Sequence, residues 1–249
     1  MIVQIYEIQT PQEAERCIEL GVNNIGSVLL SLDEWRVPLL KEVYRLTEGT
    51  GTKSVLLPLF RDDDTLYRAL DYYRPDHVHF CESLTDRHGE KIDLEGFFRY
   101  QKRLKDYFPE INIIRSIPIC EKGKTPGFST LKIARTLEPV SDCFLTDTWL
   151  EEEPVAGYIG ITGRTVDWAI ARELVIQSDI PVILAGGLSP ENVYDAILKT
   201  RPAGADSCTR TNFVGEPGKP VRFKKDFEKV EKFVTEVRRA EQAMRSKET

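Results

Sequence analysis

The sequence predicts a single-domain (β/α)8 barrel of the α/β class, and three observations carry that prediction. Short apolar runs rich in β-branched residues alternate with longer segments of helical period, the order that builds βα units around a parallel sheet. Eight such repeats of about 30 residues can be counted, which is the number and size expected of a closed barrel. An open doubly wound sheet often has a glycine-rich turn after its first strand, and the segment IYEIQTPQEAE has no glycine there.

The expected elements follow one another along the whole chain. Strands are predicted at residues 2–7, 23–29, 53–59, 76–81, 111–117, 142–146, 180–185 and 203–207. Helices are predicted at residues 11–20, 33–47, 63–73, 93–107, 128–138, 165–177, 190–200 and 224–243. We expect residues 1–243 to form the barrel and residues 244–249 to form a frayed polar tail. Stretches bearing proline or glycine are predicted to be functional loops between a strand and the next helix, at 122–127, 154–163 and 214–220.

Composition excludes several classes of protein. A chain of 249 residues with a hydrophobic fraction of 41% is long enough for one sizeable core. The net charge of -6 provides no basic face for nucleic acid. No apolar run approaches the roughly 18 residues of a membrane span, and the start MIVQIYEIQT lacks the order of a secretion signal. We therefore expect a cytoplasmic protein without nucleic-acid or membrane partners, and its oligomeric state stays open.

The cysteines give no sign of a disulfide framework or a metal site. They are odd in number, widely scattered and without a CxxC pair, and they stand at Cys17, Cys81, Cys120, Cys143 and Cys208. We expect reduced thiols, no bound metal and no other cofactor.

The loops after the last two strands are predicted to bind a phosphate group. Gly186 and Gly187 follow the seventh strand, and without a Cβ their backbone N–H groups can approach a ligand closely. Residues 189–191 (Ser-Pro-Glu) have the form of a helix cap followed by a first-position proline, and open amides at a helix start bind anions. Ser207 and Thr209 lie beside them at the usual phosphate site of this fold. The alternative is a tight glycine turn with solvated hydroxyl groups.

A long loop after the sixth strand is predicted to cover the site. It contains Gly160, Thr162 and Gly163, which we take as substrate-binding candidates. Asp147 stands where the strand ends, so its carboxyl group is expected at the barrel mouth. A half-buried carboxyl group with a raised pKa can act as a general acid. The alternative role for Asp147 is a helix cap or a hydrogen-bonding group of the loop.

Several motifs in the second half of the chain resemble one known family. They read FLTDT, GITGRTVDW, ILAGGLSPENVYDAI, RPAGAD and PVRFKKDFEKVEKFV, and they resemble phosphoribosylanthranilate isomerase, the barrel enzyme of tryptophan biosynthesis. TPQEAERCIELGVNNIGSVL is similar to that family's first helix and second strand, whereas residues 60–140 match only in pattern. The resemblance implies a phosphorylated small-molecule substrate.

The resemblance also implies a reaction, an Amadori rearrangement. An acid opens the ribosylamine ring, and a base removes the C2 proton of the resulting iminium to give an enolamine. By resemblance, Asp147 is the acid. The family's base is a cysteine near the end of the first strand, in a Lys-Ile-Cys-Gly run, and an ungapped match places Tyr6 on that cysteine and Gln4 on the lysine. On the fourth strand, Cys81 occupies the position of the family's histidine.

These departures change the predicted mechanism. A tyrosine with an ordinary pKa near 10 is a poor base at neutral pH. Glu7 or Cys81 is therefore considered as the base, and we expect little isomerase activity on phosphoribosylanthranilate. Arg36 lies after the second strand, where the family uses an arginine for the anthranilate carboxylate, although its spacing from Gly26 is one residue longer. A solvated charge is the alternative role for Arg36.

Other chemistries fit the predicted barrel less well. A Schiff-base aldolase needs a lysine near the carboxyl end of a strand, and Lys53 stands at the start of one. Of His77 and His79, at most His79 is expected to reach the site, and a satisfied structural histidine is its expected role. Three interpretations remain: a related isomerase with an altered base, a true phosphoribosylanthranilate isomerase, and a phosphosugar-binding protein that has lost catalysis.

Overall fold

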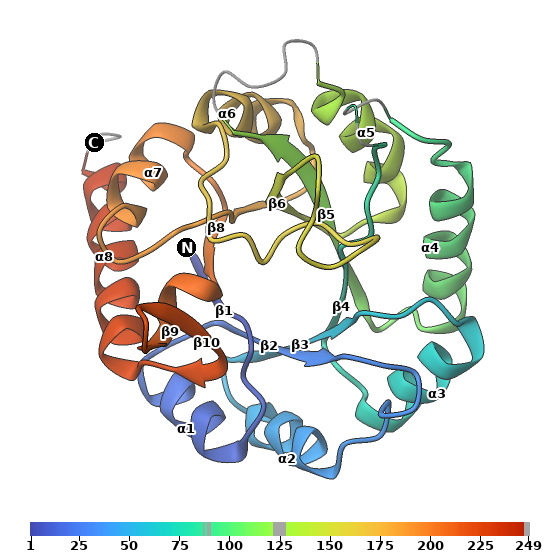
Figure 1. Cartoon of the computed structure of the whole chain (residues 1–249), viewed down its shortest axis with the longest axis horizontal. Helices are drawn as coiled ribbons and strands as arrows, with labels where there is room; N and C mark the ends of the chain where they lie inside the picture. Colours follow the sequence, from blue (N-terminus) through green and yellow to red (C-terminus); the bar gives the residue numbers. More distant parts are fainter. Residues whose placement is uncertain (87, 89–90, 122–127, 247–249) are drawn as a thin grey trace.

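The computed structural model describes residues 1–86, 88, 91–121 and 128–246, and its eight parallel strands close into a barrel (Figure 1). The strands are β1 (Ile2–Ile5), β2 (Asn24–Leu29), β3 (Lys53–Pro58), β4 (His77–Phe80), β5 (Asn112–Cys120), β6 (Cys143–Trp149), β7 (Val182–Leu184) and β8 (Gly204–Ser207). The helices around them are α1 (Pro11–Glu19), α2 (Pro38–Thr47), α3 (Asp63–Tyr73), α4 (Glu95–Tyr107), α5 (Thr130–Leu137), α6 (Trp168–Gln177), α7 (Val193–Thr200) and α8 (Phe227–Arg245). The predicted fold class is confirmed.

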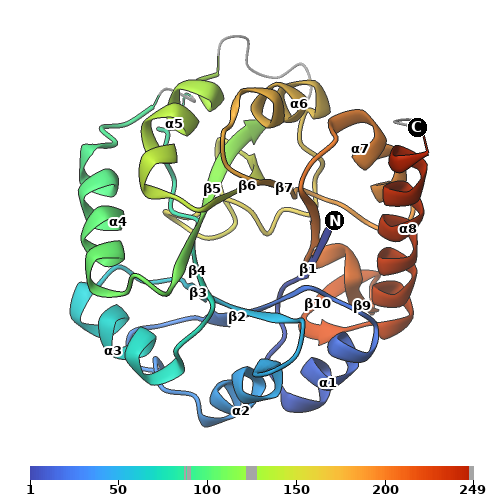
Figure 2. The same cartoon turned by 180° about the vertical axis from the view of Figure 1, so that it is seen from behind.

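Closure of the barrel depends on the pairing of its first and last strands. β1 pairs in parallel with β8, with Gln4 opposite Asp206 and Ile5 opposite Ser207. Figure 2, the view from behind, shows the same closed ring of strands inside the ring of helices. Two apolar clusters fill the structure, one between strands and helices and a smaller one inside the barrel. No helix in the described ranges is long and apolar enough to cross a membrane.

Local signals in the sequence explain where several helices begin. At α1, the hydroxyl of Thr10 accepts from the backbone N–H of Glu13, and the Glu13 carboxylate accepts from the backbone N–H of Thr10, a complete capping box. At α3 the carboxylate of Asp62 accepts from the backbone N–H of Thr65, and at α8 that of Asp226 accepts from the backbone N–H of Lys229. These caps pair backbone N–H groups that have no partner within the helix.

Several helix boundaries differ from the prediction, and three of them have a visible cause. α2 begins at Pro38 and not near residue 33, because Val37 before the proline is extended. α7 begins at Val193 and not at residue 190, since the segment before it forms a turn whose Ser189 carbonyl accepts from the N–H groups of Asn192 and Val193. α8 continues to Arg245, so the helix extends into the segment predicted as a frayed tail, and Met244 packs against the core.

A β-hairpin before the last helix was not predicted. The stretch 214–220, expected to be a loop, is the turn of an antiparallel pair, β9 (Asn212–Gly215) and β10 (Lys219–Lys225). The segment carries glycine and proline at its turn, but its strands lack the apolar alternation of a core strand because they lie largely exposed. Figure 1 shows this hairpin beside β1 at the rim of the barrel. The predicted loop at 122–127 lies outside the described residues.

The inside of the barrel is packed around a tyrosine ring. Tyr6 is 4% exposed, and Gly26 on β2 lies against its ring so closely that a Cβ at this position would overlap the ring carbons. Since β2 is otherwise an ordinary strand, the glycine is required here by close approach and not by backbone conformation.

We predict that Gly26→Ala destabilises the protein by about 1–3 kcal/mol, the usual cost of overpacking a core. Denaturant unfolding monitored by circular dichroism measures this change in the free energy of unfolding. In the double variant Gly26→Ala/Tyr6→Ala the overlap is gone, so its loss should be smaller than the sum of the two single losses. If the two single losses in the free energy of unfolding simply add up in the double variant, Gly26 is not required to make room for the Tyr6 ring.

Candidate active site

A cavity of about 700 Å³, part of it open to solvent, lies at the carboxyl ends of the barrel strands. Residues from seven of the eight strands or from the loops after them line it, together with the β9–β10 hairpin. It is the position at which active sites of this fold occur. The structure brings most of the predicted site residues to this cavity: Tyr6, Glu7, Cys81, Asp147, Thr162, Gly163, Gly186, Gly187, Ser207 and Thr209. Gly160 and Arg36 are not among the residues that line it.

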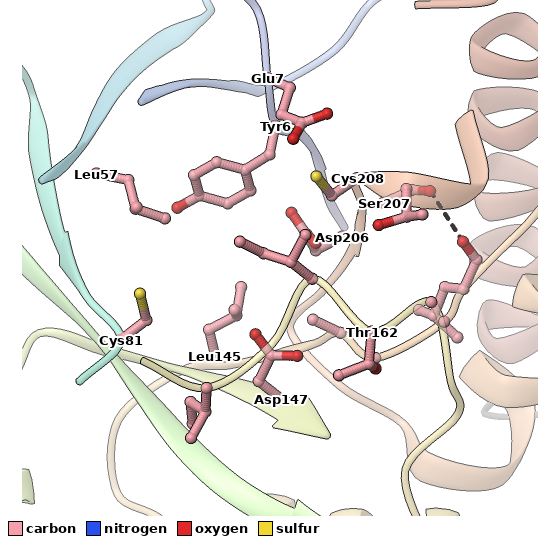
Figure 3. A pocket seen from close by; sticks show the side chains of 18 of the residues that line it. Tyr6, Glu7, Leu57, Cys81, Leu145, Asp147, Thr162, Asp206, Ser207 and Cys208 are labelled. Atoms are coloured by element: carbon pink, nitrogen blue, oxygen red, sulfur yellow. Dashed lines mark hydrogen bonds between the residues drawn. The ribbon is translucent and has the colours of Figure 1, made fainter. Parts of the chain in front are cut away.

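Asp147 lies on the cavity wall near the end of β6 (Figure 3). Burial raises the pKa of its carboxyl group to about 7, against the effect of the Thr148 backbone N–H, which donates to it at 2.9 Å. Gly160, with φ of +101°, stands directly over this carboxyl group, and a Cβ there would overlap Asp147 Oδ2. Gly160 therefore leaves room for the Asp147 carboxyl group, even though it does not itself line the cavity.

A second carboxyl group, which the sequence analysis did not single out, faces the same cavity. Asp206 on β8 is buried, and burial together with the charge of Asp147 raises its pKa to about 8, while a hydrogen bond from Gln4 acts in the opposite direction. Figure 3 shows Asp147 and Asp206 on the walls around one space. The available signal was the RPAGAD motif, in which this aspartate directly precedes the candidate Ser207 at the end of a strand.

Tyr6 ends a buried chain of polar groups inside the barrel. Its hydroxyl lies 2.6 Å from Nδ1 of His79, and Nε2 of the same ring lies 2.8 Å from Oγ of Ser116. Burial and the nearby Arg115 charge lower the pKa of His79 to about 3, so the imidazole is neutral. Burial raises the pKa of Tyr6 well above 10, which leaves the phenol protonated. The expected structural role of His79 agrees with its two partners.

The other two candidates for the base are also constrained by their surroundings. Burial, followed by the charges of Glu82 and Asp147, raises the pKa of the Cys81 thiol well above 9. Burial would raise the pKa of Glu7 as well, but hydrogen bonds from Arg222 and Asn212 outweigh it and lower the pKa. Glu7 is thus an ionised carboxylate that already has hydrogen-bonding partners.

The predicted phosphate loops meet on one side of the cavity. Gly186 and Gly187 have φ of +95° and +59°, and a Cβ on Gly187 would lie 2.5 Å from the backbone carbon of Arg164. Glycine is therefore required here by conformation and by space. The hydroxyl of Ser207 donates to the carbonyl of Leu188 at 2.8 Å, so it holds the two loops together.

The loop after β8 adds a cation to this side of the cavity and contacts the loop after β6. Arg210 lines the cavity, and its Nε donates to the carbonyl of Gly163 at 3.0 Å. Its side chain is exposed, and Thr209 and Thr162 line the same cavity. Among the described residues, no group of three or more His, Cys, Asp or Glu is arranged to hold a metal ion.

Comparison with known proteins identifies a family. The profile of the N-(5'-phosphoribosyl)anthranilate (PRA) isomerase family matches residues 109–236. The N-(5'-phosphoribosyl)anthranilate isomerase 1 of Methanosarcina mazei is 33% identical over 199 residues, which are 79% of this chain and 75% of that protein. The chain belongs to the PRA isomerase family.

Two further relatives of the PRA isomerase family differ in how much of the chain they match. The isomerase of Methanothrix thermoacetophila is 29% identical over 245 residues, 95% of this chain and 97% of that protein. With the isomerase of Methanosarcina acetivorans, an identity of 33% extends over 132 residues, so the chain spans about half (52%) of that relative's length. A PRA isomerase crystallised with reduced 1-(o-carboxyphenylamino)-1-deoxyribulose 5-phosphate has the same fold, with a TM-score of 0.65, 17% identity and coverage of 96% of this chain and 99% of that one.

Arg36 is not where the resemblance to PRA isomerases placed it. The side chain is exposed, does not line the cavity, and lies with its guanidinium carbon 4.8 Å from the ring centroid of Tyr72. Arg36 falls within the helix predicted at residues 33–47, but the segment before Pro38 is not helical and the arginine lies before α2. Its cation–π contact stabilises the outside of the barrel.

We predict that ribose 5-phosphate binds at the loops after β6, β7 and β8 and stabilises the protein. At 100 times its dissociation constant the ligand should add about 2.7 kcal/mol to the free energy of unfolding, measured by thermal unfolding. Arg210→Gln should weaken this binding about tenfold, because a charge-assisted contact to the phosphate is lost. Arg36→Gln is the matched control and should bind like the parent chain. Absence of any shift with ribose 5-phosphate would rule out the phosphate site.

Proposed function

We propose that this protein isomerises N-(5'-phosphoribosyl)anthranilate by an Amadori rearrangement. The observation that carries the proposal is the pair of cavity carboxyl groups, Asp147 and Asp206, whose pKa values lie at about 7 and about 8. Groups that titrate near neutral pH are suited to exchange protons with a substrate in both directions. The glycine and threonine loops beside them suit the phosphate of the same substrate.

In the proposed mechanism Asp147 is the general acid. Its proton passes to the ring oxygen of the ribosylamine, the bond between C1 and that oxygen breaks, and the nitrogen lone pair forms an iminium. Burial raises the pKa of Asp147 to about 7 and that of Asp206 to about 8, so near neutral pH the pair holds a single proton. The reactive form is the minor one, in which Asp147 carries this proton and Asp206 is ionised. Gly160 allows the carboxyl group to stand there without a clash.

We propose Asp206 as the general base. Its carboxylate takes the proton from C2 of the iminium, the electrons of that bond form the enolamine, and the enolamine tautomerises to the ketone. Tyr6 and Cys81 are disfavoured as bases, because the pKa of Tyr6 is raised well above 10 and that of Cys81 well above 9, whereas the pKa of Asp206 is about 8. The lowered pKa of Glu7 and its hydrogen-bonding partners disfavour it as well.

This proposal favours the true isomerase over the two other interpretations. Relatives that carry the isomerase name are 29–33% identical to this chain over most of its length. The replacement of the family's cysteine by Tyr6 pointed to weak activity, and only Glu7 and Cys81 were considered as replacement bases. Asp206 supplies a base within the same cavity.

The deciding experiment is turnover by the two carboxyl variants. Asp147→Asn and Asp206→Asn keep the side-chain shape but remove the transferable proton or the proton acceptor, so each should lower kcat by about 10²–10⁴-fold. Affinity for ribose 5-phosphate should stay nearly unchanged in both. Tyr6→Phe is the control and should lower kcat by less than about tenfold, because the phenol is not the base. An inactive parent chain, or a Tyr6→Phe variant as inactive as Asp206→Asn, would contradict the proposal.

The same pair predicts a narrow pH optimum. Below about pH 7 both carboxyl groups are protonated and the base is lost, whereas above about pH 8 both are ionised and the acid is lost. A plot of kcat/KM against pH should therefore be bell-shaped, with its maximum between about 7 and 8 and a decline on each side. A profile that stays flat from pH 6 to pH 9 would show that these carboxyl groups do not carry the protons.

A further inference from the structure

Arg222 on the β9–β10 hairpin lies at the cavity, in contact with Glu7 just after the end of β1. Arg222 lines the cavity and is 38% exposed, and its Nε donates to Oε1 of Glu7 at 2.7 Å. Its guanidinium carbon lies 4.7 Å from the ring centroid of Phe223, which further restricts the side chain. Within the described part of the chain, Nη1 and Nη2 of Arg222 donate no hydrogen bond.

The hairpin is irregular at this residue. Val214 pairs with Pro220 and Asn212 pairs with Lys225, so residues 221–224 of β10 stand opposite Phe213 alone. Bulges of this kind turn a side chain away from the direction that regular pairing would give it. Phe223 has φ of +58°, an unfavourable conformation for a bulky residue, and such strain concentrates at functional sites.

Glu7 holds the irregular segment in place. Its carboxylate, 2% exposed, accepts from Arg222 Nε, from Asn212 Nδ2 at 2.7 Å and from the backbone N–H of Phe223 at 3.1 Å. Lys225, whose Nζ donates to Asn212 Oδ1, adds a second cation to this hydrogen-bonded group. This group contains two positive charges, on Arg222 and Lys225, and one negative charge, on Glu7. A second anion that approaches from the cavity would therefore balance the remaining positive charge.

We propose that Arg222 binds the aromatic carboxylate of the substrate, the role that the family resemblance gave to Arg36. A guanidinium group whose Nε is already engaged still offers its two terminal nitrogens, which match the two oxygens of a carboxylate. Arg210 is the other cation of the cavity among the described residues, and it stands at the phosphate loops. The two anionic ends of the substrate thus each meet one arginine. This inference rests on the proposed function, because it assumes that the substrate carries an anthranilate carboxylate.

Binding of two inert analogues tests the assignment without turnover. One is reduced 1-(o-carboxyphenylamino)-1-deoxyribulose 5-phosphate, and the other is the same compound without the carboxylate. The parent chain should bind the carboxylate form about 10–100-fold more tightly, as measured by calorimetry. Arg222→Gln should bind both compounds equally, and Arg222→Lys should keep part of the preference because it keeps the charge. Arg36→Gln should keep all of it.

The controls separate the possible failures. Each variant is accepted only if its thermal midpoint and its affinity for ribose 5-phosphate match those of the parent chain, and Arg222→Lys covers the case in which Arg222→Gln does not fold. If Arg222→Gln keeps the preference for the carboxylate, or loses affinity for both analogues equally, the assignment of Arg222 is wrong. A parent chain that prefers the carboxylate form but shows no turnover would overturn the proposed function and support the assignment.

Discussion

The pairing of β1 with β8 is the constraint on which the rest of this structure depends. It joins residues about 200 positions apart in the sequence and sets Gln4 opposite Asp206, with the backbone N–H of Tyr6 donating to the carbonyl of Ser207. Because both strands end at the same rim, the cavity receives side chains from the beginning and the end of the chain. The hairpin after β8 then reaches Glu7 directly.

Burial acts in opposite directions on the groups of this cavity. It raises the pKa of Asp147 and Asp206 toward neutrality, where a carboxyl group can exchange protons. The same low-polarity surroundings move the pKa values of Tyr6 and Cys81 further from neutrality and keep both groups protonated. One environment therefore favours carboxyl chemistry over phenol or thiol chemistry.

Glycine residues leave space for the buried groups around this cavity. Gly26 makes room for the Tyr6 ring, Gly160 for the Asp147 carboxyl group, and Gly187 for the backbone of the loop after β6. Where space is limited in this way, a change at one position requires a change at its neighbour. Tyr6 and Gly26 form such a pair.

Much of the fold was determined by the sequence alone, since the alternation of apolar runs and helical segments depends on residues close together in the chain. The positions of all eight strands, the capping box at Thr10 and the glycines after β7 follow from local pattern. Only the tertiary structure decided that Asp206 lies in the same cavity as Asp147. It also decided that Arg222 lines the cavity and that Arg36 lies outside it. Burial, hydrogen-bond partners and the direction of a side chain depend on residues distant in sequence, and they set the pKa values and contacts on which function depends.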